Sequence, residues 1–345
     1  MKLSELSVAG HESLTSCTED NGYHGLIAIH STRLGPAIGG TRFWHYRNQQ
    51  EAIDDVLRLA RGMTYKNALA GIPFGGGKSI IIRNDQPLDR EEIFRTHGRF
   101  VETFGGRYIT AEDVGTSPAD MEHVRKETQH VAGLMSGSGD PSPVTARGVF
   151  RAIQAAAKYR WGSDSLAGRT VALQGCGNVG YHLASYLHDA EARLIVSDID
   201  AQKVERVVKD FAASAVAPEE IYDADADIFA PCGLGGVIND QTIGRLKVEI
   251  VAGAANNQLL EPRHGDALAA REILYAPDYA ANAGGVINGC RDLLGWERAQ
   301  AAAKVDLIYE TLLNIFQLSA SQGITTYKAA DRLAEQRLGG NATAI

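Results

Sequence analysis

Two lysines flank a run of glycines between Arg61 and Ile82, in the sequence RGMTYKNALAGIPFGGGKSIII. The segment GGGKS, which contains Lys78, ends as a phosphate-binding Walker A loop does. That motif, GxxxxGK[ST], requires a glycine at position 72, where this chain has Ile72. The spacing therefore excludes a phosphate-binding loop around Lys78, and both Lys66 and Lys78 need another explanation.

The residues after Lys78 also argue against phosphate binding. A phosphate loop opens a helix, whereas SIIIR is a β-branched run that predicts a strand. The glycines are better explained as positions where the backbone approaches a small molecule, because a residue without Cβ permits close contact. An ordinary loop before a strand is the alternative.

A second glycine pattern, QGCGNVG, has the form GxGxxG. The strand Val171–Leu173 precedes it and a helical pattern follows, which is the context of a dinucleotide-binding turn. Gly175 would form the turn, Gly177 would admit the pyrophosphate, and Gly180 would let helix and strand pack. The alternative is a glycine-rich turn that binds no nucleotide.

The remaining residues of this turn suit NAD. Asn178 and Val179 open the predicted helix, whose N-terminus would face the phosphates. Asp198 follows Gly175 by 23 residues, near the spacing of about 20 that the motif expects. Its carboxylate would accept hydrogen bonds from both ribose hydroxyls and repel a 2′-phosphate, which favours NAD over NADP.

Regular elements position these residues. Apolar residues recur at helical spacing from Gln49, so a long amphipathic helix should carry Lys66 near its end. Asp89 with Glu92 predicts the start of the next helix. The strand RYIT then delivers AED, which puts Asp113 at a strand end.

A Gly/Ser/Pro-rich segment, GLMSGSGDPSP, marks a domain boundary between Gly133 and Pro143. A helix from about Val144 to Tyr159 follows and carries Thr145 in its first turn. The strands DIFAP, EIVAGA and ILYAP then alternate with helical patterns, as in a doubly wound sheet. The loops after such strands line the ligand crevice, and here they contain Pro231-Cys232, Asn256-Asn257 and Pro277-Asp278.

We therefore predict a two-domain α/β protein. Residues 1–134, with a C-terminal helix at about 325–345, form an α/β domain for substrate binding and oligomerisation. Residues 135–324 form a Rossmann-type, doubly wound NAD-binding domain that includes an alanine-rich helix from Glu297 to about Ser321. The two domains are expected to close over a cleft between them.

Composition narrows the class of partner. The 345 residues carry a net charge of −8, which gives no basic surface for nucleic acid or anionic lipid. No apolar stretch approaches the roughly 18 residues of a membrane span, and the N-terminus lacks a signal peptide's apolar core, so a cytoplasmic location is expected. Four widely spaced cysteines predict free thiols and no metal site. A small-molecule partner is expected.

Taken together, the motifs resemble the Glu/Leu/Phe/Val dehydrogenase family over nearly the whole chain. They are GPAIGGTR, LRLARGMTYKNALAG, GGGKS, RYITAEDVGT, DPSPVTA, QGCGNVG, APC, AGAANNQL, RHGD, YAPDY and NAGGVIN. The resemblance implies NAD-dependent, reversible oxidative deamination of an L-amino acid to its 2-oxo acid and ammonia. Leucine-acting members are the most similar, which implies a branched-chain aliphatic substrate such as leucine, valine or isoleucine.

Site roles follow from the same resemblance. Lys66 matches the lysine that binds the substrate carboxylate, assisted by Gly39, Gly40 and Met63. Lys78 and Asp113 match the catalytic lysine and aspartate. On the cofactor side, Thr145 corresponds to the threonine that orients the nicotinamide amide, and Asn256 lies where the family contacts the nicotinamide ribose. Cys232, in a loop after a strand, is a further expected cofactor contact. The resemblance also implies substrate contacts for Asn257, Val286 and Gly289.

The chemistry is consistent with these residue types. Burial beside another cation lowers the pKa of a lysine, so Lys78 can be neutral and act as a base. Asp113 can exchange protons with the amino group, while Lys66 stays charged beside a carboxylate. No additional lysine stands beside Gly39 and Gly40, which argues for an uncharged side-chain pocket.

Two departures from the leucine-acting pattern keep alternatives open. Gly289 stands where those enzymes usually carry valine, so a wider pocket could admit phenylalanine or tryptophan. The C-terminus, LGGNATAI, lacks their basic extension, which leaves the expected homo-oligomer open between a dimer and an octamer. A non-catalytic NAD-binding sensor or partner subunit is the alternative from another class.

Overall fold

The computed structural model describes residues 1–83, 89–134 and 139–339, and within them the chain divides into two compact units. The first comprises Met1–Gly139, Gly289–Trp296 and the residues from Ala334 onwards; the second comprises Asp140–Asn288 and Glu297–Leu333. The change of unit after Gly139 lies within the Gly/Ser/Pro-rich segment. Gly289–Trp296 cluster with the first unit, whereas the predicted division kept them in the second.

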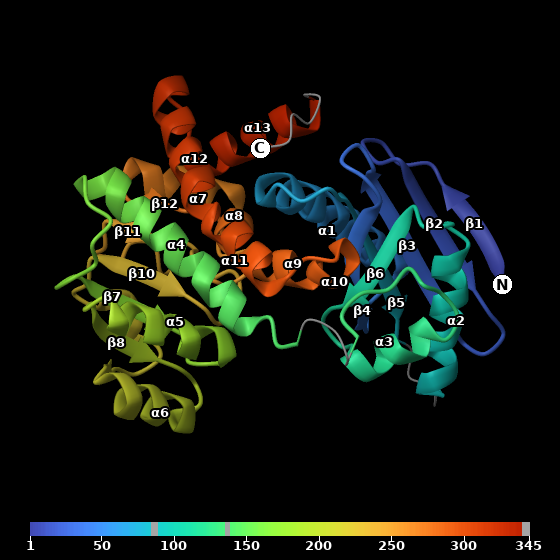
Figure 1. Ribbon diagram of the computed structural model, residues 1–345, viewed down its shortest axis with the longest axis horizontal. Helices are drawn as coiled ribbons and strands as arrows, with labels where there is room; N and C mark the ends of the chain where they lie inside the picture. The colour runs from blue at the N-terminus through green and yellow to red at the C-terminus, as the bar shows by residue number, and fades with distance from the viewer. Residues whose placement is uncertain (84–88, 135–138, 340–345) are drawn as a thin grey trace. The chain divides into compact units, whose positions relative to one another are not determined.

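The first unit is built on a mixed six-stranded sheet in the order β1-β2-β3-β5-β4-β6 (Figure 1). Its strands are β1 Lys2–Leu6, β2 Ser13–Thr18, β3 His24–Ser31, β4 Ala37–Trp44, β5 Gly75–Ile82 and β6 Tyr108–Glu112. Its first three helices are α1 Gln49–Ala70, α2 Arg90–Glu102 and α3 Pro118–Arg125. Strand β4 pairs with β5 on one side and with β6 on the other, and both pairings are parallel.

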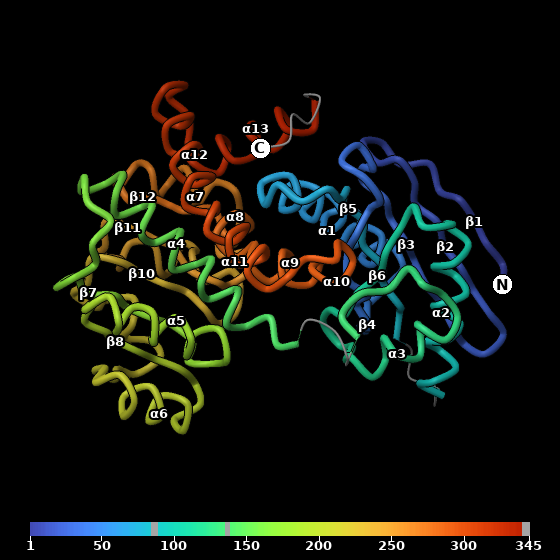
Figure 2. Tube along the Cα trace, viewed as in Figure 1, coloured from blue at the N-terminus to red at the C-terminus, as the bar shows by residue number. Residues whose placement is uncertain are grey.

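Helices cover both faces of this sheet, as the alternation along β3 shows. Leu26 and Ala28 pack into a core with α1, while Ile27 and Ile29 pack into the core that contains the apolar side of α2. Because successive side chains of a strand point to opposite faces, every strand next to β3 has one α1 face and one α2 face. The Cα trace shows α1 running beside β5 (Figure 2).

The second unit contains an entirely parallel sheet in the order β12-β11-β10-β7-β8-β9. Numbered from β7, this is the 3-2-1-4-5-6 order of dinucleotide-binding Rossmann folds read from β9, with its switch point between β7 and β10. Its strands are β7 Thr170–Gln174, β8 Arg193–Ser197, β9 Ser214–Ala215, β10 Ile228–Pro231, β11 Ile250–Val251 and β12 Leu274–Tyr275.

Helices surround this second sheet, and α4 packs against α5, α11 and α12. The helical segments after residue 139 are α4 Ser142–Trp161, α5 Asn178–Asp189, α6 Ala201–Phe211, the 3₁₀ turn η1 Glu220–Asp223, α7 Pro262–Ala270, α8 Asp278–Ala281, α9 Gly284–Gly289, α10 Arg291–Leu294, α11 Arg298–Asp306, α12 Ile308–Gln322 and α13 Thr326–Gly339. The predicted mixed α/β class with a Rossmann-type parallel sheet is confirmed.

Local signals in the sequence matched the structure where capping residues were present. Asp89 caps α2 by accepting a hydrogen bond from Glu92 N, and Ser117 forms a capping box with Asp120 at α3. The alanine-rich helix predicted from Glu297 is instead two helices, because the α-helical hydrogen-bond pattern is interrupted at Leu307. The strands β1 and β2 were not predicted.

The last helix, α13, ends against α1. Within the first unit the Tyr65 hydroxyl donates to Glu335 Oε1 at 2.8 Å, and Arg337 Nη1 donates to the carbonyls of Ala68 and Leu69 at 3.0 and 2.7 Å. The final residues after 339, including most of LGGNATAI, lie outside the described part of the chain.

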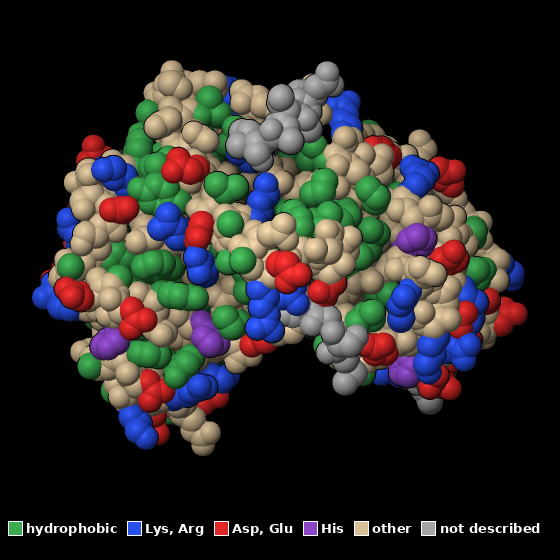
Figure 3. All heavy atoms as spheres, in the orientation of Figure 1, with side chains coloured by type: hydrophobic (Ala, Val, Ile, Leu, Met, Phe, Trp, Pro, Cys, Tyr) green, Lys and Arg blue, Asp and Glu red, His purple; other side chains and the backbone are tan. Residues whose placement is uncertain are grey.

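Charged side chains cover much of the surface visible in Figure 3. Side chains of both charge signs are interspersed over the face shown in Figure 3. Among the described residues, no helix is both long and apolar enough to cross a membrane.

Candidate active site

The catalytic pair predicted from the sequence meets in the first unit. Lys78 lies on β5 and Asp113 follows the last residue of β6, and Lys78 Nζ lies 2.8 Å from Asp113 Oδ2. Only 5% of Lys78 is exposed, while the Asp113 side chain keeps 25% of its surface. The ammonium is therefore buried and the carboxylate is partly accessible.

Burial sets the electrostatics of this pair. It lowers the pKa of the Lys78 ammonium, and the positive charge of Arg42 acts in the same direction, although Asp113 opposes both. Burial also raises the pKa of the Asp113 carboxyl, but the charges of Lys78 and Arg42 outweigh it and the net pKa is lowered. The site therefore favours a lysine that gives up its proton more readily than usual beside an ionised aspartate.

Two charged residues of this site were not predicted from the sequence. Arg42, on β4, donates from Nε to Asp113 Oδ2 at 3.2 Å and from Nη1 to Asp55 Oδ2 at 2.9 Å. Asp55 lies on α1. An available signal was that Arg42 is two residues after Gly40 and so shares its sheet face.

The glycines around Lys78 allow neighbouring strands and helix α1 to pack closely together. A Cβ on Gly76 would lie 2.1 Å from Thr64 N of α1, and one on Gly39 would lie 1.8 Å from Gly77 O. A Cβ on Gly40 would lie 2.3 Å from Glu112 O. The expectation that these glycines make room for a small molecule finds no support in these directions, because protein atoms fill the space.

The predicted carboxylate clamp lies on α1. Lys66 and Met63 are both half-buried near the C-terminal end of this helix. The helix packs on β5 where Thr64 approaches Gly76, two residues before Lys78. Since Gly76 and Lys78 alternate with Gly77 along the strand, the Lys78 side chain lies on the α1 face of the sheet.

A neutral hydrogen-bonded cluster lies on the opposite face of the same strands. The Thr41 hydroxyl lies 2.8 Å from Ser79 Oγ and 2.9 Å from His97 Nε2, and the Tyr23 hydroxyl lies 2.7 Å from His97 Nδ1. The Thr41 hydroxyl also contacts the hydroxyl of Thr110 on β6 at 2.5 Å. His97 is fully buried, which lowers its pKa to about 3 and keeps it neutral.

In the second unit the GxGxxG turn has the geometry of a dinucleotide site. Gly175 has φ +97°, and a Cβ there would lie 2.7 Å from Gly233 N. A Cβ on Gly180 would lie 1.9 Å from Gly175 O, so this glycine lets α5 pack on the turn. At Gly177 a Cβ would meet nothing within 4 Å, which is the open space that a pyrophosphate needs. The residues therefore fit a dinucleotide.

The acid of this motif follows β8. Asp198 Oδ2 accepts from Cys176 N at 2.7 Å, and Oδ1 accepts from Asp200 N at 2.9 Å. A carboxylate has about four lone-pair positions, so both oxygens keep the capacity to accept ribose hydroxyls. Asn178, which is exposed, and Val179, which is half-buried, begin α5 as predicted.

The start of α4 packs closely on α9. The Thr145 hydroxyl donates to Pro141 O at 3.0 Å, and a Cβ on Gly285 would lie 2.8 Å from Thr145 Oγ1. The glycines of NAGGVIN therefore permit this packing beside Thr145. Val286 is half-buried in the same short helix, and at Gly289 an added Cβ would meet nothing within 4 Å.

The asparagine pair lies after β11, as expected. Asn256 and Asn257 are both exposed, and Asn257 has φ +52°. The buried Asn282 donates to Asn256 Oδ1 at 2.8 Å and so fixes that amide. Cys232 N donates to Gln174 O at 2.6 Å, and burial raises the pKa of the Cys232 thiol to about 12. Cys232 is therefore a protonated thiol beside the glycine turn.

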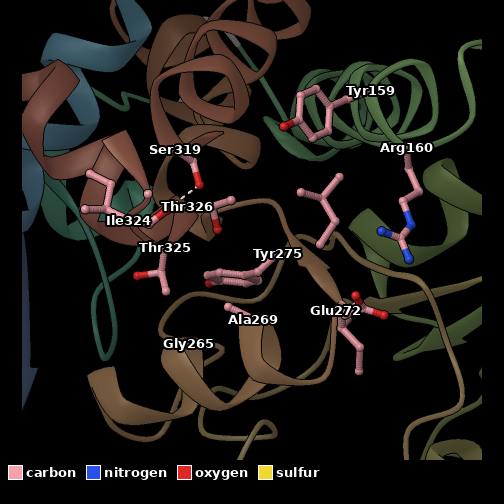
Figure 4. Close-up of a pocket in the computed structure, with 13 residues that line it drawn as sticks. Tyr159, Arg160, Gly265, Ala269, Glu272, Tyr275, Ser319, Ile324, Thr325 and Thr326 are labelled. Atoms are coloured by element: carbon pink, nitrogen blue, oxygen red, sulfur yellow. Dashed lines mark hydrogen bonds between the residues drawn. The ribbon is translucent and has the colours of Figure 1, made fainter. Parts of the chain in front are cut away.

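The four cysteines are free, and the part of the chain that the structure describes contains no cluster of three or more metal-binding side chains. A pocket of about 320 Å³ lies elsewhere in the second unit, at the start of β12 (Figure 4). Tyr159, Arg160 and Tyr275 are among its lining residues. None of the predicted site residues lines it.

Comparison with known proteins agrees with this arrangement. Residues 12–130 match the family described as Glu/Leu/Phe/Val dehydrogenase, dimerisation domain, and residues 136–204 and 196–338 match Glutamate/Leucine/Phenylalanine/Valine dehydrogenase. The chain is 52% identical to leucine dehydrogenase from Geobacillus stearothermophilus, covering 95% of this chain and 90% of that protein. It is 43% identical to phenylalanine dehydrogenase from Caldalkalibacillus thermarum, covering 96% and 92%.

A solved structure is also similar over nearly the full length. The crystal structure of L-tryptophan dehydrogenase from Nostoc punctiforme superimposes with a TM-score of 0.88 at 47% identity, covering 95% of this chain and 96% of that one. The sequence similarity to these proteins spans both units.

Proposed function

We propose that this chain, which belongs to the Glu/Leu/Phe/Val dehydrogenase family and is an amino-acid dehydrogenase, oxidatively deaminates a branched-chain aliphatic L-amino acid with NAD. In the forward direction the amino acid and water yield the 2-oxo acid, ammonium and one proton, while a hydride passes to NAD. The 52% identity to a leucine dehydrogenase supports leucine, valine or isoleucine as the substrate.

The observation that carries the proposal is the buried contact between Lys78 Nζ and Asp113 Oδ2 at 2.8 Å. Deamination needs a base that takes a proton from water and a second group that exchanges a proton with the amine. The lowered pKa of Lys78 suits the first role, and the partly accessible carboxylate of Asp113 suits the second.

The proposed partner of the substrate carboxylate belongs to the same unit. Lys66, half-buried on α1, would bind the substrate carboxylate and remain charged because the ion pair favours that form. Bound NAD would supply the hydride acceptor for the substrate Cα. Lys78 then takes a proton from the water that adds to the substrate carbon, and Asp113 exchanges a proton with the leaving amine.

Cofactor choice depends on the second unit. The open space at Gly177 and the N-terminus of the 12-residue helix α5 would hold the pyrophosphate, and Asp198 would accept the ribose hydroxyls. A 2′-phosphate would meet the negative charge of Asp198, which supports NAD over NADP. Thr145 would orient the nicotinamide amide.

An aromatic substrate is the second candidate. The open space at Gly289 and the similarity to tryptophan and phenylalanine dehydrogenases favour it. We also infer a homo-oligomer, since residues 12–130 match a domain described as a dimerisation domain. A cytoplasmic location remains a prediction.

Replacing the proposed base tests the mechanism. We expect Lys78→Ala to lower kcat for leucine by about 10²–10⁴-fold, because the base is lost. The dissociation constant for NAD, measured by calorimetry, should stay unchanged. Lys126→Ala is the matched control, since Lys126 also pairs with a carboxylate in the first unit but is exposed at the surface. A parallel loss of NAD binding, or a kcat equal to that of the control, would contradict the proposal.

A substrate panel tests the specificity. Values of kcat/KM for leucine, valine, phenylalanine and tryptophan, with NADH formation followed by absorbance, should rank leucine or valine first. A phenylalanine or tryptophan value well above both would favour the second candidate. Repeating the assay with NADP for wild type and Asp198→Ala tests the cofactor, since the variant should discriminate less against NADP.

A further inference from the structure

Arg42 joins two carboxylates that belong to different elements of the first unit. Its Nε lies 3.2 Å from Asp113 Oδ2, and its Nη1 lies 2.9 Å from Asp55 Oδ2. The exposed fraction is 21% for the Arg42 side chain and 16% for the Asp55 side chain. Strand β4 lies between β5 and β6, so the guanidinium is held between the strand of Lys78 and the end of the strand before Asp113.

The far end of this bridge is itself fixed. The buried Tyr46 donates its hydroxyl to Asp55 Oδ2, the oxygen that also accepts from Arg42, at 2.8 Å. Arg58 Nη2 donates to the other oxygen, Oδ1, from a side chain that is 55% exposed, and an exposed ion pair of this kind adds little to the fixation. Asp55 also belongs to the 22-residue helix α1, which packs on β5. A planar guanidinium with two bonded edges has one orientation, so Asp55 determines how Arg42 faces Asp113.

Two cations therefore converge on one oxygen, Asp113 Oδ2, with Lys78 Nζ at 2.8 Å and Arg42 Nε at 3.2 Å. Their behaviour differs, because a lysine can lose its proton near neutral pH when buried, whereas an arginine stays charged. If Lys78 were the only partner, Asp113 would have no counter-charge while Lys78 is neutral and ready to act as a base. Arg42 keeps a positive charge at that oxygen throughout.

We propose that Arg42 is a positioning residue of the dehydrogenase reaction: anchored by Asp55, it holds the Asp113 carboxylate oriented and ionised while Lys78 is uncharged. This inference rests on the roles proposed above for Lys78 and Asp113. Arg42 touches neither the substrate nor the cofactor in this assignment and acts only through Asp113.

The charges around Asp113 affect its pKa in the direction that the proposal requires. Lys78 and Arg42 face Asp113 directly, and Tyr108 also interacts with it electrostatically. Glu112, whose carboxyl pKa is raised by burial, precedes Asp113 in the chain. Asp55 lies beyond Arg42, with Tyr46 and Arg58 beyond Asp55. Removing the charge of Arg42 would raise the pKa of Asp113 and also that of Lys78, since Arg42 lowers both. Both changes move the active protonation state to higher pH.

The experiment compares Arg42→Gln, Arg42→Lys and the control Arg58→Gln. Arg58 also contacts Asp55 but is 55% exposed and belongs to the far side of the bridge from Asp113. For each folded variant, kcat and kcat/KM for leucine are measured across pH with saturating NAD. The pKa of Asp113 is followed separately by ¹³C NMR of the labelled carboxyl, a signal that does not require turnover.

For Arg42→Gln we expect kcat to fall at least tenfold and the acidic limb of the pH profile to move up by about one unit, because a neighbouring cation is lost. The NMR pKa of Asp113 should rise in the same variant. Arg42→Lys keeps a positive charge, so its acidic limb should lie closer to the wild-type position than that of Arg42→Gln. If Arg42→Gln fails to fold, the pH profile of Arg42→Lys tests the role of Arg42. Arg58→Gln should keep the wild-type profile.

An unshifted limb and an unshifted Asp113 pKa in folded Arg42→Gln would overturn the inference, as would an Arg42→Lys limb displaced like that of a neutral substitution. Failure of the underlying function has a different signature. Wild type and Arg58→Gln would then show no leucine-dependent NADH formation, and the NMR titration alone would judge the role of Arg42.

Discussion

Replacing Gly40 by alanine should disable the proposed catalytic pair while both Lys78 and Asp113 keep their chemical identity. A Cβ at this position would lie 2.3 Å from Glu112 O and 2.9 Å from Asp113 Cβ, whereas ordinary contact begins at 3.4 Å. The end of β6 would have to move by roughly 1 Å, and a displacement of about that size in a catalytic group can cost about 10²-fold in rate. We therefore expect Gly40→Ala to lower kcat for leucine by about two orders of magnitude.

The assay is NADH formation with saturating leucine and NAD, together with the melting temperature and the NAD dissociation constant. NAD binding should be unchanged, since the dinucleotide turn belongs to the second unit. Gly62→Ala is the matched control, because Gly62 lies on α1 and an added Cβ there would meet nothing within 4 Å. A folded Gly40→Ala enzyme with kcat within about threefold of the control would refute the reasoning.

Three further predictions concern other parts of the chain. His97 has a folded pKa of about 3 against an ordinary 6.5, so stability should be lost as pH falls between these values, by up to about 1.4 kcal/mol per pH unit. Urea unfolding should show a weaker pH dependence in His97→Gln. Gly177→Ala should fold normally but bind NAD at least about tenfold more weakly, whereas Gly180→Ala should lower the melting temperature, because its Cβ would lie 1.9 Å from Gly175 O. Gly289→Val should raise the preference for leucine over phenylalanine by about tenfold or more in kcat/KM.

Each of these has a result that counts against it. Parallel stability curves for wild type and His97→Gln would mean that another group governs acid unfolding. Wild-type NAD affinity in Gly177→Ala would mean that the pyrophosphate does not bind at that turn. An unchanged leucine-to-phenylalanine ratio in Gly289→Val would place Gly289 outside the substrate pocket.

Features that depend on near neighbours in sequence were predictable. Asp89 and Glu92, or Ser117 and Asp120, are three residues apart, and their hydrogen bonds form as soon as the helix does. The GxGxxG turn is similar in part, because the φ of +97° at Gly175 and the packing of Gly180 on Gly175 O are local to one turn and helix. The resemblance to a family supplied the pairing of Lys78 with Asp113, which no local pattern contains.

Features that depend on the tertiary fold were not predictable. The two-residue spacing from Gly40 places Arg42 on one face of the sheet, but its contact with Asp113 depends on the order of β5, β4 and β6. The same holds for the close packing of Gly76 against Thr64 of α1 and of Gly77 against Tyr108 of β6. Strand β1 was missed because four of its five residues are exposed, so its sequence shows no buried face.

Adjacent residues of β5 belong to opposite chemical environments, and this constrains how the sheet can assemble. Lys78 enters the charged side with Asp113, while Ser79 enters the neutral cluster with Thr41 and His97. A slip of β5 by one residue would exchange them, placing an ammonium among buried neutral groups and leaving Asp113 without it. The residues proposed for catalysis thus also penalise misaligned strand pairing, so folding to the correct register and assembling the site are one event.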